Sequence, residues 1–125
     1  MGGNTSDLLQ VAVSAAEDRR ASDIVVLDLR GLSMVTDYFI LCSGSSDTNV
    51  KAIADSVEAR LKEEGQRPFG IEGHQEGSWV LMDYVDFVLH IFQVEKRLAF
   101  SLEDLWKDAK RVNLSLAAPK AGQGP

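Results

Sequence analysis

The 125 residues, 45% of them apolar and 26% charged, fit a single soluble globular domain. The net charge of −6 argues against bulk electrostatic binding to nucleic acid and favours attraction to a basic protein surface. The single cysteine, Cys42, excludes an internal disulfide and indicates a reducing compartment. With His74 and His90 it cannot supply four zinc ligands.

The first ten residues, MGGNTSDLLQ, lack the basic start and apolar run of a secretory signal. No apolar stretch approaches the roughly 18 residues that a membrane span needs. We therefore expect no membrane association and a cytoplasmic location.

The first half of the chain predicts two helices separated by two strands. Ser6 or Asp7 can cap a first helix that ends near Arg20, and strands follow over 24–30 and 38–43. A second helix over 47–64 has one apolar stripe, and Gly65 is suited to a left-handed cap after it. The stripe consists of Val50, Ile53, Ala54, Val57 and Leu61.

The second half predicts three short strands over 69–72, 78–83 and 87–94. Ser101 and Asp104 form a capping box for a short last helix. The fold class is therefore α/β (α+β), a mixed sheet of about five strands with helices packed on it. We assign residues 1–114 to one domain and expect residues 115–125 to be a disordered tail.

The stretch SGSSDTNV, from Ser43 to Val50, is either a phosphate-binding loop or a helix start. Phosphate loops direct backbone N–H groups at an anion and usually add a lysine or arginine. Here Asp47 stands where positive charge would help, and no GK[ST] or G-x-G-x-x-G motif is present. Capping of the helix by Ser46 or Asp47 is the favoured interpretation.

Candidate catalytic groups are few. Nucleotidyl transfer needs carboxylates that converge on magnesium, but Asp28 is paired with Arg30 on the same strand. Asp83 and Asp86 flank a probable turn, where acids are common for structural reasons. We expect no enzyme activity, no cofactor and no metal.

The segment WVLMDYVDFVLHIF, from Trp79 to Phe92, predicts a hairpin with Tyr84 and Val85 at its tip. In the predicted register Trp79 faces His90, Leu81 faces Val88, and Asp83 faces Asp86. One face is then apolar and suited to packing under helices, and the other carries aromatic and polar groups typical of protein-binding sites. The candidate partner-binding residues are Trp79, Asp83, Tyr84, Asp86, His90 and Phe92. The alternative is that Trp79 and Phe92 are core residues and that His90 is half-buried.

Three runs of this sequence resemble the ribosomal silencing factor family, also called Iojap-like. They are DIVVLDLRGLSMVTDYFILCSGSSDTNVKAIADSVE, EGHQEGSWVLMDYVDFVLHIF and RLAFSLEDLWKDA, and the resemblance extends over about residues 8–112. One departure is Val85, where a glycine or small polar residue would be expected at a hairpin tip. Phe100 is another, where a tyrosine would be more usual.

The resemblance implies a non-catalytic protein that binds the large ribosomal subunit through large-subunit ribosomal protein fourteen. It would block joining of the small subunit and lower translation when nutrients are short. The implied fold is nucleotidyltransferase-like but lacks catalytic carboxylates. The alternatives are a nucleotide-binding or nucleotidyl-transferring enzyme and a dimeric adaptor; the sequence leaves open a homodimer and a minor rRNA contact.

Overall fold

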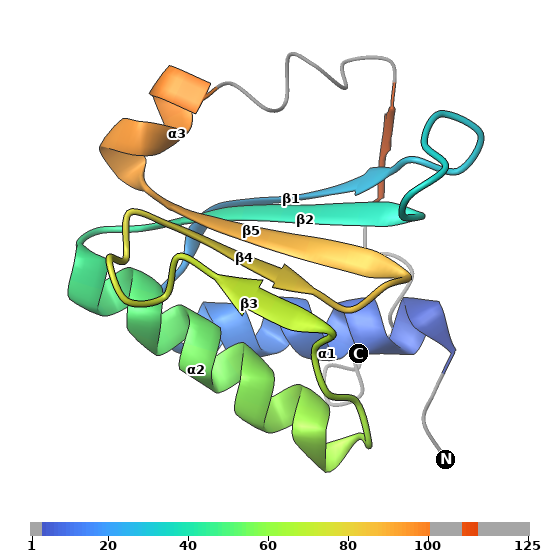
Figure 1. Cartoon of the computed structure of the whole chain (residues 1–125), viewed down its shortest axis with the longest axis horizontal. Coiled ribbons are helices and arrows are strands. Elements are labelled where there is room, and N and C mark those ends of the chain that lie inside the picture. Colours follow the sequence, from blue (N-terminus) through green and yellow to red (C-terminus); the bar gives the residue numbers. More distant parts are fainter. Residues whose placement is uncertain (1–3, 101–108, 113–125) are drawn as a thin grey trace, which may run out of the picture.

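The computed structural model of the chain describes residues 4–100 and 109–112, and these form an α+β fold (Figure 1). In this part of the chain one six-stranded mixed sheet has the strand order β3-β4-β5-β2-β1-β6. Neighbouring strands are antiparallel except β2 and β5, which are parallel. The elements are α1 (Thr5–Asp18), β1 (Ser22–Asp28), β2 (Tyr38–Gly44), α2 (Asp47–Glu63), β3 (Gly70–Glu72), β4 (Trp79–Asp83), β5 (Phe87–Gln93), α3 (Val94–Phe100) and β6 (Lys110–Arg111).

Helices α1 and α2 lie together on one face of the sheet (Figure 1). The predicted stripe of α2 is buried over its whole length, and α1 buries Leu8, Leu9, Ala12, Ala15 and Ala16. Alanines on α1 keep its contact side flat, so that α2 can approach closely. The Ser56 hydroxyl of α2 donates a hydrogen bond of 2.9 Å to the Ala15 carbonyl of α1. The burial of the stripe residues confirms the predicted apolar stripe of α2.

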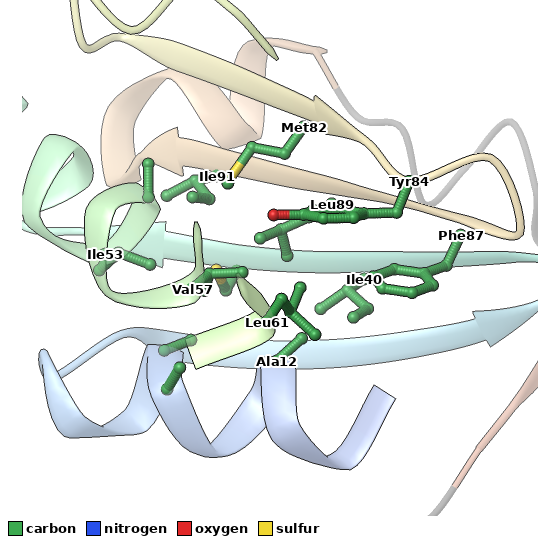
Figure 2. Packing of buried hydrophobic residues seen from close by; sticks show 14 of the residues in the cluster. Ala12, Ile40, Ile53, Val57, Leu61, Met82, Tyr84, Phe87, Leu89 and Ile91 are labelled. Carbon is green, nitrogen blue, oxygen red and sulfur yellow. The ribbon is translucent and has the colours of Figure 1, made fainter. Parts of the chain in front are cut away.

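Buried side chains lie on both faces of the central strands, because side chains alternate between the two faces along a strand. On β2, Ile40 and Cys42 belong to the larger cluster under the helices, and Leu41 belongs to a smaller cluster on the opposite face. Figure 2 shows the larger cluster, in which α2 side chains meet those of β4 and β5. Burial raises the pKa of the Cys42 thiol to about 12, as expected for an inert core cysteine.

The helix ends follow the capping rules, with one correction. Ser46 caps α2, since its hydroxyl accepts the Asn49 N–H at 3.0 Å, and Gly65 follows the helix with a φ of +82°. At α1, however, the cap is Asn4, whose side chain accepts the Asp7 N–H at 2.9 Å. The prediction of Ser6 or Asp7 was wrong because several adjacent residues can cap and only the backbone path decides between them.

The C-terminal half differs from the prediction in two places. The strand expected to reach Val94 ends at Gln93, and the unpredicted helix α3 begins there because VEKRLAF suits a helix once the apolar run has ended. The two-residue strand β6 pairs with β1 and adds a sixth strand to the five expected. The helix predicted from Ser101 and the predicted tail over 115–125 lie outside the described residues.

The α2 stripe should be a main source of stability. We expect Ile53→Ala to lower the free energy of unfolding by about 2–5 kcal/mol, because Ile53 is fully buried between helix and sheet. The matched control Glu63→Ala, in the last turn of the same helix, should change it by less than about 0.5 kcal/mol. Urea denaturation of the three proteins measures this; equal effects would contradict the assignment of the stripe to the core.

Candidate functional site

Backbone N–H groups of the loop that leads into α2, and of the first turn of that helix, donate hydrogen bonds to side chains at the helix start. The Ser45 N–H donates to the Asn49 side-chain oxygen at 2.9 Å, and the Thr48 N–H donates to the Asp47 carboxylate at 2.8 Å. A Cβ on Gly44 would lie 2.8 Å from Cγ2 of Val50, so this glycine is needed for close packing of the helix on β2. These N–H groups are therefore committed within the chain, and the helix-start interpretation fits the geometry.

A cation does lie beside this loop, and no motif in the sequence predicted it. Arg97 of α3 places Nη1 3.0 Å from the Ser43 hydroxyl and 2.5 Å from the Asp23 carbonyl oxygen. These contacts tie α3 to the ends of β1 and β2. The guanidinium therefore has a structural role at this position.

The carboxylates of Asp28 and Asp83 also have hydrogen-bond partners within the chain. Arg30 contacts both oxygens of Asp28, at 2.9 and 2.7 Å, and this hydrogen bonding holds the pKa of Asp28 below its usual value. Asp83 accepts the Val85 N–H at 2.8 Å. Within residues 4–100 and 109–112 no group of three or more His, Cys, Asp or Glu residues is arranged to hold a metal ion.

The hairpin exists, but the predicted register was wrong by two residues along β5. Trp79 pairs with Phe92, Leu81 with His90, and Asp83 with Val88. The predicted partners of these three residues were His90, Val88 and Asp86. A shift of two residues preserves the alternation of faces, whereas a shift of one would have reversed it. The predicted sorting of side chains between the two faces therefore survives.

The register follows from an unusual tip. The Tyr84 N–H donates to the Phe87 carbonyl at 2.9 Å, so the turn residues are Val85 and Asp86, one residue later than predicted. The Asp86 N–H donates back to the Tyr84 carbonyl at 2.8 Å, and Val85 has a φ of +72°. Such a γ-turn is rare and strained, and a sequence without glycine at the tip gives no signal for it.

The six candidate partner-binding residues do not form one exposed face. Asp86 is exposed at the tip, and Trp79 and Asp83 are half-buried on the face away from α1 and α2. His90 and Phe92, on that same face, are 4% and 1% exposed.

Tyr84 lies on the other side, under the helices. It stacks on Phe87 with ring centroids 5.1 Å apart (Figure 2), and burial raises its pKa. Tyr84, predicted at the hairpin tip, therefore lies in the core. For Phe92 the alternative of a core residue is confirmed, and His90 is buried more deeply than that alternative expected, because Phe39 and Leu41 of the neighbouring strand share their face.

Trp79 and His90 form the polar centre of an aromatic cluster on this face. The indole Nε1–H donates to Nδ1 of His90 at 3.1 Å, and the Trp79 ring stacks on Phe92 with centroids 5.1 Å apart. Phe39 meets the His90 ring edge-on at 4.6 Å. Since Nδ1 accepts, the proton of the neutral imidazole lies on Nε2, which has no hydrogen-bond partner among the described residues. Burial lowers the pKa of His90 to about 4.

The sequence interpretation missed the loop between β1 and β2, which it treated as a linker. This loop exposes Met34 and Val35 almost fully, and it is hydrogen-bonded to the hairpin tip. Apolar side chains in a loop were the available signal, because loops are usually polar.

No helix among the described residues has the length and hydropathy to cross a bilayer.

Three comparisons with known proteins agree with one another. The family described as ribosomal silencing factor during starvation matches residues 3–124. The ribosomal silencing factor RsfS of Bacillus subtilis is 41% identical over 111 residues, 89% of this chain and 94% of the relative, and the chloroplastic protein Iojap of Zea mays is 30% identical over 115 residues, 87% of this chain and 49% of the relative. The crystal structure of a Chromobacterium violaceum protein superposes with a TM-score of 0.82 at 36% identity, over 84% of this chain and 88% of that one.

The burial of His90 predicts a pH dependence of stability. His90 titrates near 4 in the folded chain and near 6.5 when unfolded, so the unfolded state binds the additional proton between these values. The contribution of His90 to the free energy of unfolding should be constant above pH 7 and should fall by about 3 kcal/mol between pH 6.5 and pH 4. Chemical denaturation across pH 4–8 measures the fall.

The variant His90→Gln should lose that part of the pH dependence. His74→Gln, at the histidine that contacts Asp55, should retain it. Identical pH profiles for the wild type and His90→Gln would contradict the neutral, buried state of His90.

Proposed function

Because this chain belongs to the ribosomal silencing factor (RsfS) family, we propose that it binds large-subunit ribosomal protein fourteen and thereby blocks joining of the small subunit. The family match over residues 3–124 carries the proposal. Members of the family are non-enzymatic regulators that bind the large ribosomal subunit. Occupation of the surface between the subunits would lower translation when nutrients are short, and the site of action would be the cytoplasm.

The local geometry supports binding in preference to catalysis. The N–H groups at the α2 start, the Asp28 carboxylate and the Arg97 guanidinium all have partners within the chain. A nucleotidyltransferase would need carboxylates directed at metal ions, and Asp28 is held instead by its bidentate contact with Arg30. None of these residues therefore supports the enzyme alternative.

We assign the partner contact to the hairpin. Asp86 at the tip and the half-buried Trp79 and Asp83 are accessible to a partner, whereas His90 and Phe92 support the Trp79 ring from below. A rigidly held tryptophan with acidic neighbours suits a basic protein surface, because the aromatic ring supplies contact area and the carboxylates supply orientation.

The test is co-sedimentation of the purified chain with isolated large and small subunits. We expect binding to large subunits, none to small subunits, and inhibition of subunit joining by the bound chain. Asp86→Lys should weaken binding to large subunits about 5- to 20-fold, because it reverses a charge at the contact. Glu17→Lys, the same charge change at an exposed position of α1, should bind like the wild type.

Equal binding of the wild type to both subunits, or to neither, would contradict the function. Binding to large subunits with equal loss in Asp86→Lys and Glu17→Lys would contradict the site alone, since net charge would then be the cause. Measurement at two salt concentrations separates these cases, because screening weakens long-range attraction first.

A further inference from the structure

The exposed large apolar side chains of the described residues gather at one end of the sheet, with Val94 as the exception. At this end β1 and β4 finish and β2, β3 and β5 begin, so the β1–β2 loop, the hairpin tip and the start of β3 share one end of the sheet (Figure 1). The β1–β2 loop lies beside the hairpin tip, whereas β4 and β5 separate β3 from β2. The exposed fractions are 101% for Met34, 84% for Val35, 81% for Phe69, 58% for Val85 and 48% for Leu32.

Hydrogen bonds hold the β1–β2 loop against the hairpin tip. The Thr36 hydroxyl donates to the Val85 carbonyl at 3.0 Å, and the Asp37 N–H donates to the Asp86 carbonyl at 3.1 Å. The Val35 N–H donates to the Ser33 hydroxyl at 3.1 Å. The exposed apolar side chains are thus presented by a fixed backbone, which lowers the entropy cost of binding.

Val85 is unfavourable for folding in two ways. Its φ of +72° places a β-branched residue in the left-handed region, where glycine or asparagine would be less strained. Its side chain is also 58% exposed, so its burial does not offset that strain. The fold itself gives no reason for valine at this position, and a contact outside the chain would give one.

We propose that Met34, Val35 and Val85 form an apolar tip that docks onto a protein of the large ribosomal subunit. Asp37, Asp83 and Asp86 border the tip, and so the complementary surface is an apolar depression on a protein, lined at its edge by lysine or arginine. The same carboxylates repel RNA phosphates, and Arg30, the cation of the β1–β2 loop, is already engaged by the Asp28 carboxylate. This inference rests on the proposed function and extends the binding surface to the β1–β2 loop.

The test compares Val85→Gly and Val85→Asn with the wild type. Both variants suit the left-handed backbone, so the melting temperature should stay equal or rise. Both remove the apolar contact, so the affinity for isolated large subunits should fall about tenfold. The control Val94→Asn, at the opposite end of the sheet, should leave the affinity unchanged.

A photo-crosslinker identifies the partner: Met34→p-benzoyl-phenylalanine, irradiated on isolated large subunits, should crosslink to a ribosomal protein. Crosslinking to rRNA would overturn the inference, as would wild-type affinity in both Val85 variants or a lowered melting temperature in both. If the wild type binds large subunits and the Val85 variants bind equally well, the apolar tip is wrong and the proposed function stands. If the wild type does not bind large subunits, both fail together.

Discussion

The pairing of Trp79 with Phe92 fixes which side chains of the hairpin lie next to one another on each face of the sheet. It follows from the γ-turn at Val85, which makes Val85 and Asp86 the turn residues. With this register Trp79 stacks on Phe92 and its N–H reaches His90 on the diagonal. The proposed binding surface depends on this arrangement, because the same pairing places Asp86 at the exposed end.

Several unfavourable features are concentrated on this hairpin. Val85 is strained, and the Tyr84 hydroxyl and His90 Nε2 are buried without a hydrogen-bond partner among the described residues. Each such feature costs free energy, and a fold tolerates it where the surrounding structure is firm or where function requires it. The helix layer shows the opposite character, with a continuous apolar stripe and well-capped helix starts. The contrast agrees with a stable support on one face and a binding surface at one end of the sheet.

Helices α1 and α2, strands β1 to β5 and the role of the α2 loop could be predicted because each depends on local periodicity and capping, whereas α3 and β6 were not predicted. The sorting of the hairpin faces was right although the register was wrong, since a two-residue shift keeps every side chain on its face. The burial of His90 could not be predicted, because Phe39 and Leu41 come from a strand far along the chain. The apolar tip also needed the structure, as Thr36 and Val85 are 49 residues apart in sequence.

A cryo-EM reconstruction of the chain on large ribosomal subunits would test the central claim most directly, since it shows which end of the sheet meets the subunit. The account predicts that the hairpin tip and the β1–β2 loop contact a ribosomal protein on the face that the small subunit would occupy, with α1 and α2 turned away. Contact through α1 and α2, or binding at a site that leaves the joining face open, would contradict it.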